Sequence, residues 1–353
     1  MKRRALSHFP VRITENDQGS RCLMNEYNSN NSIEVRSVTK NFQGSHVLDG
    51  ISFSVGRGEV FGFLGPNGAG KTTTLRILLG LLRPDSGEAL VLGKSLDTAD
   101  AQRKRVGVLF ENNGLIDRFT ARENLRYYAE LYEVPDIEKR ISELLEYVGL
   151  SDRGDDLVGI FSTGMKRKLG LARAILHKPD ILFLDEPSSG LDPEGQKMVH
   201  DLIVGLSGQS MTIFLNSHNL DEVSRVCSKV AILHHGTIQA YDSIERLRAG
   251  PSGSEITITL SDPALGDRAV AMINALPCVT STLQEHGHIK VTLSGQSGSA
   301  VLEALITGGF GVEEAVRQKR TLEEIYLDVV REAGGILGNP ESVAIQEKGS
   351  VKG

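Results

Sequence analysis

The chain has 353 residues, 40 % of them apolar, which is enough for two domains with cores of their own. Its formal net charge of −6, without any long Lys/Arg run, argues against a nucleic-acid binder held by phosphate contacts. Three scattered cysteines (Cys22, Cys227, Cys278) disfavour a disulfide framework, and no stretch approaches the ~20 consecutive apolar residues that span a bilayer, so we expect a cytoplasmic protein.

Composition divides the chain into four segments. Residues 1–31 are polar and lack periodicity, which predicts a disordered leader without the apolar core of a signal peptide. Across 32–249, β-rich runs alternate with amphipathic helical stretches, the pattern of an α/β domain with a largely parallel sheet. After a Gly/Pro/Ser-rich linker, residues 254–331 predict a small α+β domain, and the polar residues 332–353 predict a flexible tail.

The small domain has elements that follow the order β-α-β-β-α-β, with one further helix at its end. This order is that of a ferredoxin-like unit. Strands are predicted at 255–260, 278–284, 288–293 and 311–316, and helices at 264–275, 298–307 and 321–331.

A strand that begins at Val60 is followed by the pattern G-x-x-x-x-G-K-T and then by apolar residues at helical spacing. Such a loop turns backbone N–H groups toward phosphates, while Lys71 supplies a positive charge and Thr72 a ligand for Mg²⁺. The start of the helix also favours an anion. The predicted phosphate-binding residues are Gly65, Pro66, Asn67, Gly68, Ala69, Gly70, Lys71, Thr72 and Thr73.

An apolar run typical of a buried parallel strand ends in Asp185, Glu186 and Pro187. Beside a phosphate loop, Asp185 is expected to hold Mg²⁺ through its water shell, and Glu186 to polarise the water that attacks the γ-phosphoryl group. A solvated acidic strand end is the competing interpretation for this run taken alone.

Together these motifs resemble the ATP-binding cassette (ABC) family, whose landmarks follow in the family's order from about residue 33 to 248. Phe161-Ser-Thr-Gly-Met165 stands where the family commonly has Leu-Ser-Gly-Gly-Gln, and it opens a helical run. The resemblance implies a P-loop NTPase fold that binds ATP and Mg²⁺: a RecA-like core, an antiparallel β subdomain and a helical subdomain. It also implies that two cassettes pair, with Ser162 and Gly164 completing the partner's site.

Two more motif residues follow from the resemblance. Asp192 lies in Ser188-Ser-Gly-Leu-Asp-Pro193, which matches the loop that crosses the dimer interface, although alone it would be read as a Pro/Gly turn. His218, after another apolar strand, corresponds to the histidine that contacts the γ-phosphate. Its role as a catalytic residue, beside Glu186 and Lys71, depends on this motif context.

Two further positions carry open alternatives. Phe42 stands where the family stacks an aromatic ring on adenine, and a core Phe is the competing interpretation. Glu111 stands where a Gln usually meets Mg²⁺ and the attacking water. A carboxylate can bind Mg²⁺ but adds negative charge beside the phosphates, so Glu111 could instead transmit motion to the membrane subunit.

A helical insertion, 120–132 and 137–148, is where the family receives its membrane subunit. The resemblance therefore implies a peripheral protein on the cytoplasmic face of the membrane, held by separate permease subunits and paired with a second cassette, identical or different. Gly164-Met-Lys166, Glu111 and the segment 321–327 are similar to exporters of drugs, antibiotics or lipids. The alternative is a soluble ABC ATPase that acts as a nucleotide-driven switch, and the small domain is favoured as a dimerising or stabilising appendage.

Overall fold

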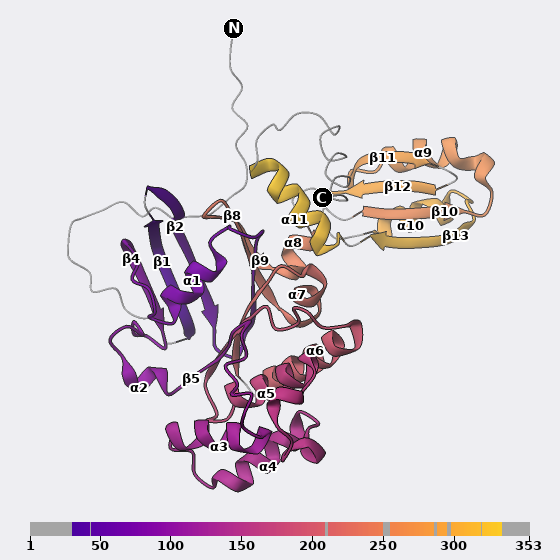
Figure 1. Ribbon diagram of the computed structural model, residues 1–353. Helices are drawn as coiled ribbons and strands as arrows, with labels where there is room; N and C mark the ends of the chain where they lie inside the picture. The colour runs from indigo at the N-terminus through magenta and orange to yellow at the C-terminus, as the bar shows by residue number, and fades with distance from the viewer. Residues whose placement is uncertain are drawn as a thin grey trace, which may run out of the picture.

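A computed structural model describes residues 30–42, 44–208, 211–249, 255–285, 288–294, 298–318 and 320–333. The predicted leader and tail lie almost entirely outside the described residues. Within them, the α/β architecture expected of the cassette is confirmed, with a six-stranded sheet at its centre (Figure 1).

The central sheet has the strand order β5-β6-β7-β3-β8-β9. All neighbouring pairs are parallel except β8 and β9, which are antiparallel. Its strands are β3 (Val60–Leu64), β5 (Val106–Leu109), β6 (Ile181–Asp185), β7 (Thr212–Ser217), β8 (Lys229–His234) and β9 (Thr237–Ser243). Strands β3, β6 and β7 are buried along their whole length, so their central residues are consecutive apolar ones and do not alternate with polar residues.

Each face of the central sheet packs against a different layer. Four phenylalanines face a three-stranded antiparallel sheet, β2-β1-β4, together with helix α1 (Lys71–Leu78). They are Phe61, Phe63, Phe183 and Phe214. The three strands are β1 (Asn31–Phe42), β2 (Ser45–Gly56) and β4 (Ser86–Val91), and they form the expected antiparallel β subdomain.

The opposite face is covered by helices. They are α5 (Thr163–Ala174), α6 (Pro193–Ser207) and α7 (Leu220–Val226). Helices α3 (Ala121–Leu131) and α4 (Ile137–Tyr147) pack on α5 and form the expected helical subdomain, while the short α2 (Asp100–Arg103) precedes β5. A capping box of Thr120 and Glu123 fixes the start of α3.

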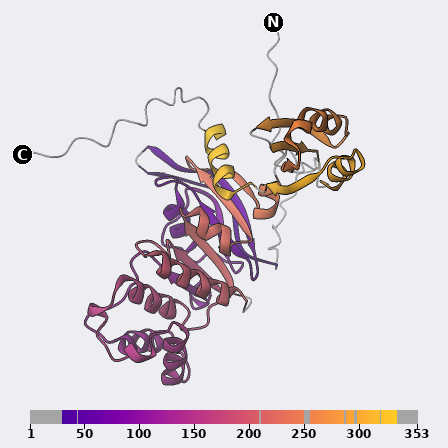
Figure 2. The same ribbon diagram turned by 90° about the vertical axis from the view of Figure 1, so that its right-hand side faces the viewer.

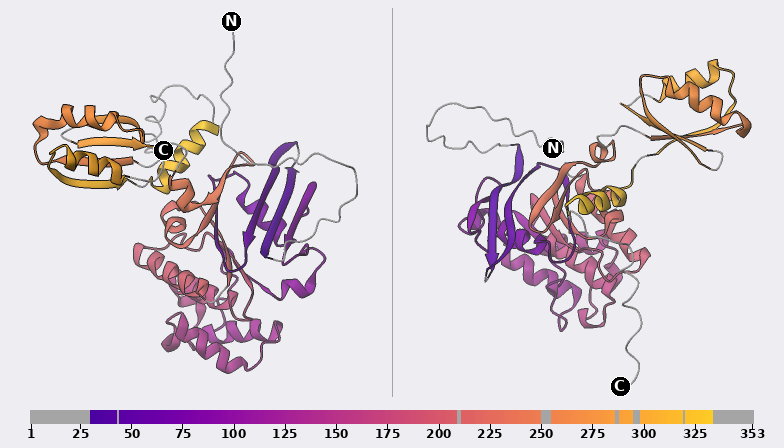
Figure 3. Two further views of the ribbon diagram at one scale, coloured as in Figure 1. Left: turned by 180° about the vertical axis from the view of Figure 1, so that it is seen from behind. Right: turned by 90° about the horizontal axis from the view of Figure 1, so that it is seen from above.

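The small domain has its own sheet and core, and it lies to one side of the cassette (Figure 3). Its sheet order is β11-β12-β10-β13, with every pair antiparallel. The elements are β10 (Glu255–Leu260), α9 (Gly266–Asn274), β11 (Val279–Glu285), β12 (His288–Leu293), α10 (Ser299–Thr307) and β13 (Val312–Gln318). They follow the predicted β-α-β-β-α-β order, and the ferredoxin-like classification stays a prediction.

Helix α11 (Leu322–Ala333) follows the small domain in sequence but packs on the cassette (Figure 2). It contacts α7, α8 (Ile244–Ala249), β8 and β9, and its Leu322 and Ile325 are buried in the cassette's core. The sequence grouped this helix with the small domain by position alone. The domain boundaries remain predictions, whereas the packing assigns the apolar face of α11 to the cassette.

Removing that contact should destabilise the cassette. Leu322 is 2 % exposed, so Leu322→Ala leaves a cavity and is expected to lower the free energy of unfolding by about 2–5 kcal/mol. Leu327, on the same helix but 43 % exposed, gives a matched control, for which Leu327→Ala should cost at most about 0.5 kcal/mol. Urea unfolding followed by circular dichroism measures both losses. A loss for Leu322→Ala as small as that expected for Leu327→Ala would contradict a stabilising role of α11 in the core.

Candidate functional site

The loop between β3 and α1 requires glycine at several positions. A Cβ atom at Gly65 would lie 2.4 Å from the carbonyl oxygen of Leu233, and one at Gly70 would lie 2.8 Å from that of Val47. Gly68 and Gly70 also have left-handed backbones, with φ of 82° and 109°. The close packing holds the loop against the neighbouring strands, so that its backbone curls in front of the first turn of α1.

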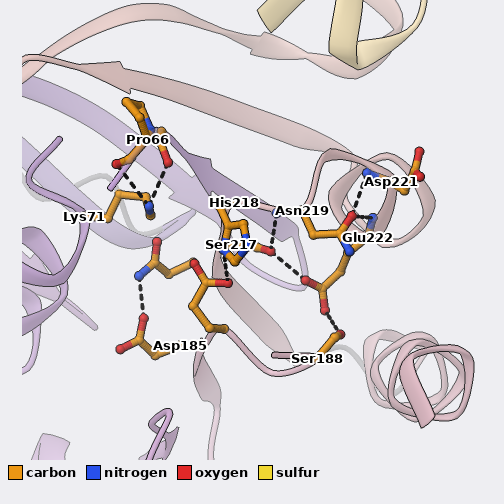
Figure 4. Close-up of polar contacts among 12 residues, drawn as sticks. Pro66, Lys71, Asp185, Ser188, Ser217, His218, Asn219, Asp221 and Glu222 are labelled. Carbon is orange, nitrogen blue, oxygen red and sulfur yellow. Dashed lines mark hydrogen bonds and ion pairs between the residues drawn. The ribbon is translucent and has the colours of Figure 1, made fainter. Parts of the chain in front are cut away.

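Lys71 is the first residue of α1, and its side chain folds back across this loop (Figure 4). Its Nζ donates to the carbonyl oxygens of Gly65 at 2.7 Å and Pro66 at 3.3 Å. Burial lowers the pKa of Lys71, while the charges of Glu186 and Asp185 act in the opposite direction. The ammonium group is thus partly desolvated and bonded to two carbonyl oxygens, which the oxygens of an anionic phosphate can replace.

Asp185 ends β6 and is nearly buried. One of its carboxylate oxygens accepts a hydrogen bond from Nδ2 of Asn216 on the adjacent strand β7. Burial raises the pKa of Asp185, and the bond from Asn216 opposes that rise. A nearby cation would therefore stabilise the ionised form of Asp185.

Glu186 follows Asp185 and contacts His218 directly. The Oε2 of Glu186 lies 2.8 Å from Nδ1 of His218, whose side chain is 60 % exposed. The backbone of Glu186 is left-handed, with φ of 49°, an arrangement that costs about 1–2 kcal/mol for a residue with a Cβ. Its N–H donates to the carbonyl of Asn216 at 2.8 Å, which helps to hold the strained residue in place.

Arg167, on α5, joins the loop of residues 110–113 (the Glu111 loop) to Glu186. Its guanidinium donates to the carbonyl oxygens of Phe110, Glu111 and Glu186 at 2.9, 3.3 and 2.9 Å, and to Oδ1 of Asn113 at 3.0 Å. Burial lowers the pKa of Arg167, and Glu111 is the largest of the nearby charges that oppose this. The side chain of Glu111 is exposed. Its link to Glu186 therefore runs through the guanidinium of Arg167, which bonds to the backbone carbonyls of both residues.

Four further predicted residues, Phe42, Thr72, Ser162 and Asp192, are exposed. Phe42 is 44 % exposed at the end of β1, which does not fit the interpretation as a core residue, and Lys40 lies 5.5 Å from the centre of its ring. Thr72 is exposed in the first turn of α1. Ser162 and Asp192 cap α5 and α6, accepting from the N–H groups of Met165 and Gly195.

The structure therefore brings some of the predicted site residues together beside the phosphate loop, while others make no hydrogen bond to that loop within the described residues. Lys71, Asp185, Glu186 and His218 lie together at the carboxyl ends of β3, β6 and β7. Within the described residues, the hydrogen bonds of Ser162 and Asp192 run to their own helices and not to the phosphate loop. Asn216 and Arg167 were not foreseen from the sequence, because an amide in an apolar strand and an arginine between two lysines carry no local signal of a buried contact.

Comparisons with known proteins agree with this geometry. The family model described as "ABC transporter" matches residues 48–189. The daunorubicin resistance ATP-binding protein DrrA3 of Streptomyces coeruleorubidus is 34 % identical over 299 residues, 84 % of this chain and 95 % of that protein. The bacitracin transport ATP-binding protein BcrA of Bacillus licheniformis is 34 % identical over 309 residues, 87 % of this chain and 99 % of that protein.

A solved structure gives the same result for the cassette. CbiO1 from Clostridium perfringens, part of the ABC transporter complex cbiONQ, superposes with a TM-score of 0.58 at 28 % identity. The match covers 62 % of this chain and 91 % of that one. Among the described residues of this chain, no helix combines the length and the apolar composition needed to cross a membrane.

Proposed function

The chain belongs to the ATP-binding subunits of ABC transporters, which couple ATP hydrolysis to transport, and from this premise we propose that it powers export of a drug or antibiotic. The observation that carries the source of energy in this proposal, ATP hydrolysis, is the grouping of Lys71, Asp185, Glu186 and His218 beside the phosphate loop. The names of the relatives, one for daunorubicin resistance and one for bacitracin transport, support the export of such compounds over a soluble switch.

Nucleotide binding is proposed to use the loop and its lysine. The N–H groups of residues 65–73 would surround the phosphates, and Lys71 would exchange the carbonyls of Gly65 and Pro66 for phosphate oxygens. The exposed ring of Phe42 would stack on adenine. Each of these groups is accessible or held only by bonds that a phosphate can replace.

Mg²⁺ is proposed to be shared between the protein and the nucleotide. The described residues contain no group of three or more His, Cys, Asp or Glu side chains that could hold a metal ion. Thr72, Asp185 and, less directly, Glu111 fit an ion whose other ligands are phosphate oxygens and water. Bound there, the ion would neutralise charge on the phosphates.

Hydrolysis is proposed to use the pair Glu186 and His218. Glu186 would accept the proton of the attacking water, and His218, 2.8 Å away, would orient the carboxylate and face the γ-phosphate. The buried Asp185 beside them would stay with the cation.

A complete site is proposed to need a second cassette. Ser162 and Asp192 are exposed at the starts of two helices, and Gly164 lies near Leu191, the residue before Asp192. The start of α5 favours an anion, so Ser162 and Gly164 would meet the nucleotide bound by a second cassette, identical or different, and Asp192 would organise that site. Separate permease subunits would hold the pair at the cytoplasmic face of the membrane, with the α3–α4 lobe as the contact.

The proposal predicts how the rate depends on protein concentration. Because two chains complete each site, phosphate release per chain should rise with concentration of the purified protein in Mg²⁺ and ATP, then level off. A rate per chain that is independent of concentration down to the detection limit would contradict assembly during turnover.

Export itself is tested in cells. Co-expression of the chain with its permease should raise the inhibitory concentration of at least one compound in a panel that includes daunorubicin and bacitracin. The matched control is the same pair carrying Lys71→Ala. Full hydrolysis by the purified chain with no change for any compound would contradict the proposed cargo while leaving the ATPase activity established.

A further inference from the structure

One buried carboxylate, that of Glu222 on α7, is bonded to both loops that carry the Glu186–His218 pair. Glu222 is 1 % exposed and does not itself contact either member of the pair through a hydrogen bond. We propose that Glu222 is a positioning residue for hydrolysis, which sets the distance between Glu186 and His218; the inference rests on the proposed function of that pair.

Each oxygen of the Glu222 carboxylate accepts from a different serine (Figure 4). Oε1 accepts from the hydroxyl of Ser188, and Oε2 accepts from the hydroxyl of Ser217 at 2.6 Å. Ser188 lies two residues after Glu186, and Ser217 lies directly before His218. The carboxylate therefore connects the end of β6 to the end of β7 behind the pair.

The connections on either side of Glu222 are short and hydrogen-bonded. The N–H of Ser189 donates to the carbonyl of Glu186 at 3.1 Å, which closes a tight turn after the glutamate. The N–H of Asn219 donates to Oγ of Ser217 at 3.0 Å, and Oδ1 of Asn219 accepts from the N–H of Glu222 at 3.1 Å. A displacement of Glu222 would therefore also displace both loops.

Helix α7 provides the fixed base for this arrangement. Val223, next to Glu222, is fully buried in the core of the cassette, and α7 packs against α6 and α11. His200, on α6, closes the side of the cluster, with Nε2 3.6 Å from Oε1 of Glu222. Because its base is packed on several sides, Glu222 can hold the two loops in one relative position.

The contact is matched to a carboxylate. Two serine hydroxyls donate to it, and the Ser217 oxygen already accepts from Asn219, so the hydrogen of Ser217 needs an acceptor of its own. Glutamine has the same shape but offers one acceptor and one donor. In Glu222→Gln, one buried serine therefore faces an NH₂ group and must turn its hydrogen away, so the charge-assisted bond to that loop is replaced by a weaker neutral one.

This arrangement separates the expected effect on hydrolysis from that on binding. Within the described part of the chain, Glu222 has no hydrogen bond or ion pair with residues 65–73, which are proposed to hold the phosphates. Loss of the carboxylate should therefore alter the geometry of the attacking water while leaving the nucleotide in place.

The test compares ATP hydrolysis by the full chain and by Glu222→Gln. We expect kcat to fall by about 10- to 100-fold, as misplacement of a reacting group does, while KM for ATP stays within about twofold. The matched control is Glu34→Gln, because Glu34 is a buried glutamate in β1 that also accepts from two side chains, those of Asn31 and Arg36. Thermal unfolding of both variants shows that each is folded.

Single and double variants test whether Glu222 acts through its serines. Ser188→Ala and Ser217→Ala should each slow turnover less than Glu222→Gln, and adding either to Glu222→Gln should have little further effect. Fully additive losses, a kcat of Glu222→Gln within about twofold of Glu34→Gln, or a parallel loss of ATP binding would overturn the inference alone. A wild-type chain that never hydrolyses ATP would overturn the proposed function, and this inference with it.

Discussion

Glu186→Gln is expected to slow ATP hydrolysis by about 10²- to 10⁴-fold, because the amide cannot accept a proton from the attacking water. The amide keeps the size of the side chain. The bond from the N–H of Glu186 to the carbonyl of Asn216, and the bond from the Arg167 guanidinium to the carbonyl of Glu186, do not depend on the carboxylate. ATP should still bind, so that a pair of chains stays closed around it. Phosphate release gives the rate, and light scattering after gel filtration in ATP gives the mass of the complex.

The same variant separates two roles for the Glu186–His218 contact. If Glu186 is the base, Glu186→Gln accumulates a dimer that contains intact ATP, and Glu34→Gln, the buried glutamate of β1, does not. Turnover close to that of the wild type would instead mean that the carboxylate only orients His218. In that case another group must receive the proton.

Lys71→Ala is expected to weaken ATP binding by about 100-fold or more. The lysine would supply two charge-assisted hydrogen bonds to phosphate oxygens, each contributing about 1.5–3 kcal/mol, and 1.4 kcal/mol corresponds to a tenfold change in affinity. Isothermal titration with ATP measures the change in Kd.

A surface lysine provides the control for that measurement. Lys104 forms an ion pair with Glu133 and is largely exposed, so Lys104→Ala removes one positive charge without touching the loop. Its Kd should stay within about twofold of the wild type. Equal weakening by both variants would show that overall charge, and not the position of Lys71, governs binding.

The sequence predicted the parts of the site that are local in the chain. The phosphate loop occupies consecutive residues, so the spacing of its glycines and Lys71 identified it, while the close contacts of Gly65 and Gly70 with backbone oxygens came from the structure. Asp185 and Glu186 stand at the end of an apolar run whose burial is confirmed. For these residues, neighbours in sequence are also neighbours in space.

Other parts depend on contacts between distant segments, which no local pattern records. Arg167 lies between two lysines, where a solvated face is the simplest interpretation, yet it is buried and holds the Glu111 loop. Glu222 appears as one more acid in a short helix, although it joins two loops from separate strands. The period of α11 predicted an apolar face but could not say which domain would cover it.

The position of α11 also has a consequence for how the protein is made. A ribosome delivers the chain from its N-terminus, so the strands and helices of the cassette emerge before the small domain. The apolar surface of the cassette that Leu322 and Ile325 cover can therefore be buried only after more than seventy further residues, from 250 to 321, have been synthesised. During that interval part of the apolar core of the cassette is exposed to solvent, and α11 is the segment that finally covers it.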